Sequence, residues 1–256
     1  READSMVRKW ELTIPQLSGD TPRRAYIYLP ESYEADTQRR YGVMYMFDGH
    51  NVFFDEDATY GKSWGMGKYL DEAHKQLIVV AVECNHQGSR RLAEYSPVSF
   101  AEDSLGRITG KGRTYMNWMV RELKPYIDAH YRTLPDRGNT AIAGSSMGGL
   151  MALYGATVYN DVFQRAACLS PSLWVAPGKL LELIARARIR RGTCVYMDYG
   201  EKELSNHGGN TQALLAAAQL LMVKGVNVTL RIAPGGSHCE ASWEKQIPVF
   251  MECLGL

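Results

Sequence analysis

Short apolar runs alternate with longer amphipathic stretches along nearly the whole chain, and this alternation restricts the possible folds more than any other feature. Several of the runs are apolar at every position, which is typical of strands in a sheet that is covered on both faces. The amphipathic stretches between them have the length and spacing of helices. We therefore expect strands at 25–30, 42–48, 77–83, 140–145, 165–170, 193–200 and 227–234, and helices at 66–76, 113–130, 146–159, 177–190, 209–224 and 240–254.

The order of these elements predicts an α/β fold in which helices flank a mainly parallel central sheet. Residues 6–29 are expected to form an antiparallel hairpin at one edge of that sheet. No repeat, linker or low-complexity segment interrupts the 256 residues. We therefore expect one domain that spans residues 1–256.

Charge and composition argue against several classes of partner. The formal net charge of +1 gives no electrostatic footprint for nucleic acid. No stretch is long and apolar enough to cross a membrane. The five cysteines stand singly, without a C-x-x-C pair, so we expect neither a disulfide framework nor a zinc site. Reduced thiols indicate a cytoplasmic protein, although the chain does not begin with Met and the sequence leaves a removed signal peptide open.

The stretch Gly144-Ser145-Ser146-Met147-Gly148 fits the pattern G-x-S-x-G between an expected strand and an expected helix. At such a sharp turn the central serine takes a strained backbone conformation, and glycines two residues away on each side avoid crowding. The hydroxyl of Ser146 would then project from the carboxyl edge of the sheet, above the positive end of a helix dipole. We expect Ser146 to be a nucleophile, whereas Ser145 occupies a variable position and should point elsewhere.

A serine hydroxyl needs a neighbouring base, and in doubly wound hydrolases the chain order is serine, acid, histidine. His238 lies on a short loop after the last expected strand and is the favoured base. Its rival, His207, lies too close to the loop that should carry the acid. The acid holds the tautomer of the imidazole and stabilises the imidazolium. It should lie at or just after the end of the strand at 193–200, and position alone leaves three candidates, Asp198, Glu201 and Glu203.

Over residues 10–252 the chain resembles the esterase D-like family of α/β-hydrolases. The resemblance is carried by the stretches YMFDGHNVFFDE, NWMVRELKPYIDAHYRT, AIAGSSMGGLMALY, SPSLWV, YGEKE and GGSHCEASW. The family includes enterobactin-type siderophore esterases, feruloyl and acetylxylan esterases, S-formylglutathione hydrolase and mycolyltransferases. In its members the acid typically stands three residues after the glycine that ends its strand, which is Gly200 here. The resemblance therefore implies a triad of Ser146, His238 and Glu203, with Glu203 preferred to Glu201.

The resemblance also implies an oxyanion hole made of the backbone N–H groups of Met147 and His50. The side chain of His50 would then be incidental. Substrate contacts are expected from loops at the carboxyl ends of the strands, where α/β proteins form their sites. The candidates are Trp174, Arg91, Glu94 and Asn51, although Arg91 and Glu94 could instead pair with each other to hold their loop.

Together these features predict a serine carboxylic ester hydrolase that works through an acyl-enzyme on small soluble, carbohydrate or aromatic-acid esters. A siderophore esterase and an acyltransferase of the same fold remain alternatives, whereas a non-catalytic scaffold would not need all three triad residues. We expect no metal or organic cofactor, because the sequence contains no H-E-x-x-H or other clear ligand cluster. The segment between residues 170 and 193 leaves no room for a lid domain, which predicts an open cleft and compact acyl groups. The natural ester and the oligomeric state do not follow from the sequence.

Overall fold

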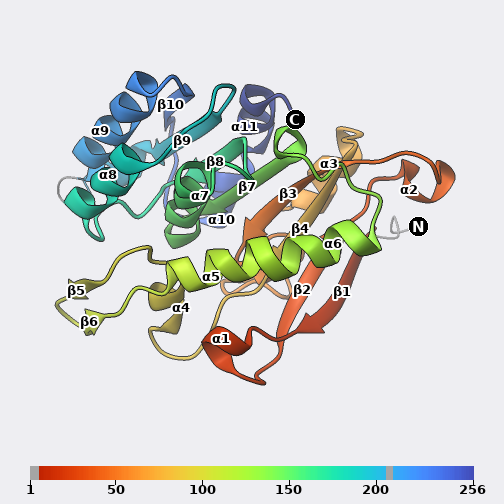
Figure 1. The fold of residues 1–256 in the computed structure, drawn as a ribbon, viewed down its shortest axis with the longest axis horizontal. Coiled ribbons are helices and arrows are strands. Elements are labelled where there is room, and N and C mark those ends of the chain that lie inside the picture. The colour runs from red at the N-terminus through yellow and green to blue at the C-terminus, as the bar shows by residue number, and fades with distance from the viewer. Residues whose placement is uncertain (1–5, 206–209) are drawn as a thin grey trace.

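The central sheet has eight strands in the order β1-β2-β4-β3-β7-β8-β9-β10, in a computed structural model that describes residues 6–205 and 210–256 (Figure 1). The strands are β1 (Val7–Leu12), β2 (Arg23–Tyr28), β3 (Gly42–Phe47), β4 (Leu77–Val82), β7 (Thr140–Ser145), β8 (Arg165–Leu169), β9 (Cys194–Gly200) and β10 (Asn227–Ala233). Strands β3, β4, β7, β8, β9 and β10 pair in parallel, whereas β1 pairs with β2, and β2 with β4, in antiparallel register. The expected parallel sheet with an antiparallel N-terminal edge is therefore confirmed.

Helices cover both faces of the sheet, so that alternate residues of a strand enter different cores. In β3, Val43 and Tyr45 pack into one apolar cluster while Met44 and Met46 pack into the other. The first cluster is covered by α5 (Gly112–Trp118), α6 (Lys124–His130), α7 (Met147–Val158), α8 (Pro177–Arg186) and α9 (Asn210–Val223). The second is covered by α3 (Met66–Glu72), α10 (Glu240–Glu244) and α11 (Ile247–Leu254). Figure 1 shows α5 and α6 lying across the front of the sheet.

Two prolines change the expected helices. The helix expected at 240–254 is divided into α10 and α11, because Pro248 lacks an N–H and is tolerated only in the first turn of a helix. The helix expected at 113–130 is continuous, but its turn at Met119–Leu123 is widened just before Pro125. A wider turn avoids the clash between a proline ring and the carbonyl four residues earlier.

Several short elements were not expected from the sequence. The loop at 85–97 contains a short helix, and a two-stranded hairpin follows it. Further short helical segments lie near the N-terminus, after β3 and β9, and directly before β7. These elements are α1 (Pro15–Ser18), α2 (Ser32–Ala35), η1 (Gly49–Asn51), α4 (Arg90–Glu94), β5 (Phe100–Glu102), β6 (Gly106–Ile108), η3 (Arg137–Asn139) and η4 (Glu201–Glu203).

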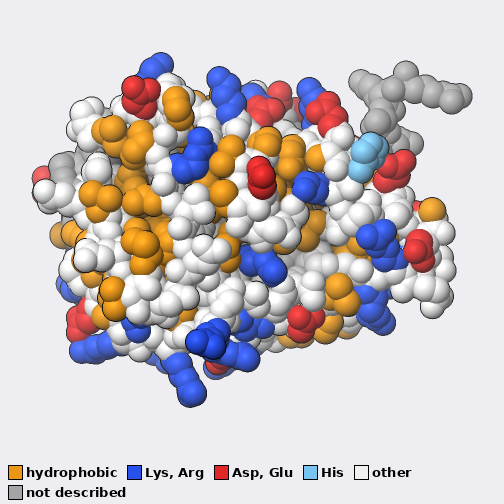
Figure 2. Space-filling view, turned by 90° about the horizontal axis from the view of Figure 1, so that it is seen from above, with side chains coloured by type: hydrophobic (Ala, Val, Ile, Leu, Met, Phe, Trp, Pro, Cys, Tyr) orange, Lys and Arg blue, Asp and Glu red, His pale blue; other side chains and the backbone are white. Residues whose placement is uncertain are grey.

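The loops that follow β3, β4, β7, β9 and β10 meet at the carboxyl edge of the parallel part of the sheet. Open α/β sheets bind their ligands at this edge. The segment from β8 to β9, which is described throughout, holds α8 and no lid domain, as expected. Within residues 6–205 and 210–256, no helix is long and apolar enough to span a membrane. On the face seen in Figure 2, acidic and basic side chains lie interspersed, in keeping with a net charge near zero.

Candidate active site

Ser146 lies at the turn between β7 and α7 with φ 60° and ψ −123°, a conformation that is strained for a residue with a side chain. A Cβ atom on Gly144 would lie 2.5 Å from the carbonyl carbon of Gly148. A Cβ atom on Gly148 would lie 3.0 Å from the Cβ of Phe47. Close packing therefore excludes a side chain at Gly144 and disfavours one at Gly148. Ser145, by contrast, is the buried last residue of β7.

An imidazole connects Ser146 to a carboxylate. The Nε2 of His238 lies 3.0 Å from the Oγ of Ser146, and its Nδ1 lies 2.6 Å from the Oε1 of Glu203. The side chain of His238 is 44% exposed, whereas that of Glu203 is 5% exposed. The three side chains come from the ends of β7, β9 and β10, so residues 92 and 35 positions apart in the sequence become neighbours.

The second carboxylate oxygen of Glu203 is held by two further donors. Its Oε2 accepts hydrogen bonds from the Ser170 hydroxyl at 2.6 Å and from the Gly200 N–H at 2.7 Å. Burial alone would raise the pKa of Glu203, but the hydrogen bonds from His238, Ser170 and Gly200 outweigh it and lower the pKa below its usual value. The carboxylate is therefore ionised at neutral pH and fixed in orientation. Sequence reasoning missed Ser170, although its place directly after β8, between two strands that end in site residues, was a usable signal.

The other candidates for acid and base lie elsewhere. Glu201 is exposed and accepts the N–H of Gly235 at 2.7 Å. Asp198 is buried and accepts the hydroxyl of Tyr196 at 2.6 Å. His207 lies outside the described residues.

The loop after β3 is pressed against the sheet. A Cβ atom on Gly49 would lie 2.8 Å from the backbone of Ala81, so only glycine fits there. His50 follows in a single turn of 3-10 helix, and Met147 is the first residue of α7. N–H groups in the first turn of a helix have no acceptor within that helix, so those of His50 and Met147 can serve a ligand.

A partly buried ion pair fixes the start of this loop. Asp48 has a left-handed backbone conformation, with φ 55° and ψ 53°. Its carboxylate accepts two hydrogen bonds from Arg91, from Nε at 2.9 Å and from Nη2 at 2.7 Å. Burial alone would raise the pKa of Asp48, but the adjacent guanidinium lowers it below its usual value. The pair joins α4 to the loop that carries His50.

Two cavities adjoin at Ser146 and His238. The smaller, of about 260 Å³, is walled by the apolar side chains of Leu92, Met147 and Trp174. The larger, of about 750 Å³, extends along the loop that carries His50.

The substrate-contact candidates divide between these cavities and the interior. Trp174 lines the smaller cavity, Asn51 lines the larger, and Arg91 lines both. Glu94 is 2% exposed and lies in neither lining, because it pairs with Arg23 at 2.7 and 2.8 Å. The expected pairing of Arg91 with Glu94 is wrong, since Asp48 and Arg23 are their partners. A buried, paired carboxylate is unavailable to a ligand, so we no longer expect Glu94 to contact the substrate.

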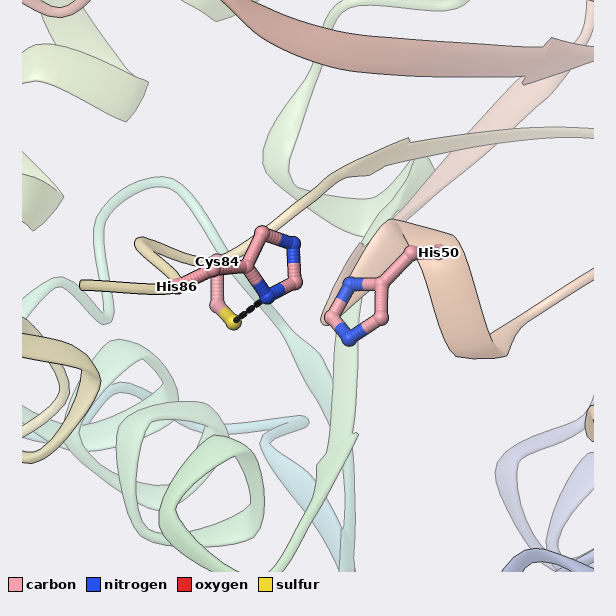
Figure 3. Close-up of side chains that lie close together, drawn as sticks. All are labelled: His50, Cys84 and His86. Carbon is pink, nitrogen blue, oxygen red and sulfur yellow. Dashed lines mark hydrogen bonds between the residues drawn. The ribbon is translucent and has the colours of Figure 1, made fainter. Parts of the chain in front are cut away.

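The structure also brings together three potential metal ligands that the sequence did not connect. The ligand atoms of His50, Cys84 and His86 all lie within 4.8 Å of one another. Figure 3 shows the two imidazole rings side by side, with the sulfur of Cys84 beside His86. Burial lowers the pKa of His50 to about 4, so its ring is neutral at neutral pH. The expectation that no ligand cluster exists is therefore wrong, because β3 and β4 are adjacent and their ends place these residues side by side.

The chain is similar to several known proteins in sequence and in structure. The chain is 24% identical over 184 residues to the uncharacterized protein YbbA of Bacillus subtilis (strain 168), a match that covers 71% of this chain and 69% of that protein. The structure of the present chain is similar to that of an IroE-like serine hydrolase from Shewanella oneidensis, with a TM-score of 0.74 and 19% identity. The match covers 97% of this chain and 88% of the other. The structure is similar as well to the enterobactin esterase FES of Shigella flexneri, with a TM-score of 0.74, 17% identity, and coverage of 99% and 59% respectively.

These likenesses establish the α/β-hydrolase fold. Residues 18–250 match the sequence model of the family described as "Putative esterase". That match spans more than half of the chain, and it identifies the activity of the fold as the hydrolysis of carboxylic esters. The chain belongs to this esterase family.

Proposed function

We propose that Ser146, His238 and Glu203 form the catalytic triad of this ester hydrolase, acting on esters whose acyl group is compact. The observation that carries the proposal is the continuous chain of hydrogen bonds from Ser146 through His238 to Glu203, at 3.0 and 2.6 Å. A serine becomes nucleophilic when an imidazole within hydrogen-bond distance can take its proton.

In the acylation step the Oγ of Ser146 attacks the ester carbonyl while the Nε2 of His238 takes the hydroxyl proton. The carbonyl oxygen becomes an anion, which the N–H groups of His50 and Met147 stabilise. Collapse of the tetrahedral intermediate breaks the bond to the alkoxy oxygen, and His238 gives its proton to the departing alcohol. Glu203 stabilises the imidazolium that exists between these two proton transfers.

In the deacylation step a water molecule attacks the acyl-enzyme, and His238 takes the proton of that water. As the second tetrahedral intermediate collapses, His238 gives its proton to the Oγ of Ser146, and the carboxylic acid is released. The same residues therefore serve both halves of the reaction, in keeping with an acyl-enzyme mechanism.

The two cavities support a division of the substrate between acyl and alcohol portions. The cavity of about 260 Å³ has apolar walls and lies below the usual volume of pockets for drug-sized ligands, so we assign it to a compact acyl group. The cavity of about 750 Å³ is more polar and we assign it to the alcohol. An alcohol portion as large as a sugar or a siderophore fragment fits this assignment.

The proposal is tested with purified protein and a panel of esters. The panel contains methyl esters of acetic, butyric, dodecanoic and ferulic acids, an acetylated xylan oligosaccharide and enterobactin. Each substrate is assayed with and without a sugar acceptor, so that acyl transfer would appear as a new acyl sugar in place of the free acid. We expect free acid as the product, highest kcat/KM for a compact acyl group, and loss of activity in Ser146→Ala. Activity that persists in Ser146→Ala would contradict the triad, and acyl sugar as the main product would identify an acyltransferase.

A further inference from the structure

The imidazole of His50 has one nitrogen satisfied and one left without a partner. Its Nε2 lies 3.1 Å from the Oγ1 of Thr59. Its Nδ1 is buried and has no hydrogen-bond partner among the described residues, although the residue is only 3% exposed. A buried nitrogen without a partner is costly unless a ligand satisfies it. The Nδ1 of His50 is therefore a buried nitrogen that can accept a ligand.

The groups beside His50 are those that a zinc ion prefers. The Sγ of Cys84 lies 3.7 Å from the Nδ1 of His86, close to the separation of roughly 3.3–3.7 Å between two ligand atoms of a tetrahedral Zn²⁺ site. The rings of His50 and His86 lie edge to face with centroids 4.6 Å apart. Since all three ligand atoms lie within 4.8 Å of one another, an inward movement of about 1 Å would complete the site.

The outer nitrogen of His86 has the partner that metal-bound histidines usually have. Its Nε2 lies 2.8 Å from the Oε1 of Glu83. A carboxylate in this place makes Nε2 the protonated nitrogen, which leaves the lone pair of Nδ1 facing Cys84. His50 is arranged in the same way, with Nε2 engaged by Thr59 and Nδ1 left for a ligand.

We propose that His50, Cys84 and His86 bind one Zn²⁺ ion on the wall of the larger cavity, and that the bound ion inhibits the esterase. Two imidazoles and one thiolate suit Zn²⁺, whereas Mg²⁺ and Ca²⁺ prefer oxygen ligands. On binding, the Cys84 thiol releases its proton to solvent and forms the zinc–sulfur bond, and each histidine donates a nitrogen lone pair. No electrons are transferred.

Inhibition follows from where the three residues lie, and this part rests on the proposed function. All three line the cavity that also contains Ser146 and His238. Three protein ligands leave the fourth position of a tetrahedral ion free for water or another ligand. In this site the fourth position would face the cavity. The ion would occupy space assigned to the alcohol. It would also bind the side chain of His50, whose backbone N–H is assigned to the oxyanion hole.

Binding is tested without any ester, by titrating the protein with Co²⁺ as a spectroscopic substitute for Zn²⁺. A thiolate ligand gives Co²⁺ an intense charge-transfer band in the near ultraviolet. We expect this band in the wild-type protein at one equivalent, its displacement by Zn²⁺, and its loss in Cys84→Ser. The matched control is Cys239→Ser, because Cys239 lines the same cavity and follows His238 directly. No band in the wild type, a band that survives Cys84→Ser, or one that is lost in Cys239→Ser would overturn the proposal.

Calorimetry in buffers of different ionisation enthalpy measures the number of protons released when Zn²⁺ binds. We expect about one proton per Zn²⁺, from the thiol of Cys84. His86→Gln is the safest variant for this measurement, because its side chain is 51% exposed and the substitution opens no cavity. We expect His86→Gln to weaken Zn²⁺ binding by more than about 100-fold, since loss of an outer-shell partner alone costs 10–100-fold. Unchanged Zn²⁺ affinity in this variant would exclude His86 as a ligand.

Inhibition is tested with the wild type and with the variants Cys239→Ser and His86→Gln. We expect Zn²⁺ to slow ester hydrolysis by the wild type and by Cys239→Ser at equal concentrations, and to require about 100-fold more for His86→Gln. Equal inhibition of His86→Gln, or stoichiometric binding without inhibition, would overturn the inhibitory role of this site. If the protein proved to hydrolyse no ester, the Co²⁺ titration would still decide whether the metal site exists.

Discussion

Arg91 and Asp48 form a bidentate ion pair, at 2.9 and 2.7 Å, that links α4 to the loop carrying His50. The pair matters because Asp48 has φ 55°, a conformation that few residues with side chains adopt. Gly49 then packs against the backbone of β4, and the N–H of His50 follows. The position of one proposed oxyanion donor therefore depends on a guanidinium from a different segment of the chain.

The first prediction concerns this pair. Arg91→Ala is expected to destabilise the protein by about 3 kcal/mol, since it leaves a buried carboxylate without its cation. We take the lower end of the range because the Arg91 side chain is 29% exposed. Arg91→Lys keeps the charge but loses the second hydrogen bond, so kcat should fall by more than KM rises. Urea unfolding and steady-state kinetics measure both effects.

The matched control for this prediction is Arg90→Ala, because Arg90 is an exposed neighbour on α4 whose side chain contacts Gln87. We expect its stability and kinetics to remain close to the wild type. If Arg91→Ala and Arg90→Ala behaved alike, the ion pair would have no part in holding the oxyanion loop.

The second prediction separates the two glutamates after β9. Glu203→Gln is expected to lower kcat by about 10³–10⁴-fold, because an amide can favour the wrong imidazole tautomer and does not stabilise the imidazolium. Glu201→Gln should have a small effect, since Glu201 is exposed and, within the described residues, its carboxylate accepts a hydrogen bond only from the N–H of Gly235. Kinetics of both variants on one soluble ester make the comparison. A larger loss in Glu201→Gln than in Glu203→Gln would move the acid to Glu201.

Much of the fold and the core of the site could be predicted from the sequence. Strand β4 is apolar at every position, and the short length of such a run indicates a strand covered on both faces rather than a helix. Ser146 lies in a motif whose glycines have a local steric cause, and that cause can be read from the neighbouring residues. His238 could be predicted because chain order limits the choice of base.

Other parts of the site depend on contacts between distant segments, which no local pattern specifies. Arg91 and Glu94 lie three residues apart on one short helix, yet their partners, Asp48 and Arg23, lie on different segments. The cluster of His50 with Cys84 and His86 likewise depends on the adjacency of β3 and β4. A sequence reading that first pairs the parallel strands and then compares the residues beyond their ends would have found it.

The third prediction concerns pH and stability. Burial raises the pKa of Asp198 to about 6, and the hydrogen bond from Tyr196 only partly offsets it. Because the usual pKa is near 3.9, the folded state binds more protons than the unfolded state between about pH 4 and pH 6, and this group's contribution to stability falls as the pH rises. Asp198→Asn removes the effect. Its free energy of unfolding relative to the wild type should therefore increase by about 2–3 kcal/mol from pH 4 to pH 7.

Urea unfolding of wild type and Asp198→Asn at several pH values between 4 and 7.5 checks this prediction. The difference between the two proteins cancels the titration of all groups that they share. A difference that stays constant over the range, or that grows toward acid pH, would show that the Asp198 carboxylate is not destabilised by burial.

The fourth prediction concerns the acyl group. The smaller cavity has about 260 Å³ and one wall formed by Trp174, which packs edge to face on Phe100 at 5.9 Å. In a p-nitrophenyl ester series kcat/KM should be highest between acetyl and butyryl, with no jump in rate above the solubility limit of the substrate. Trp174→Ala enlarges the cavity and should move the maximum to longer chains. A wild-type maximum at dodecanoyl or longer, or a Trp174→Ala profile identical to the wild type, would contradict the assignment of this cavity.

The central claim, that Ser146 is the nucleophile, is tested most directly by covalent labelling with a fluorophosphonate. Tryptic digestion places Ser145 and Ser146 in one peptide, residues 138–165, so fragmentation by tandem mass spectrometry must locate the adduct. The account predicts one adduct per chain, on Ser146, lost in Ser146→Ala and in His238→Ala and retained in Ser145→Ala. An adduct on Ser145, or labelling that persists in Ser146→Ala, would contradict it.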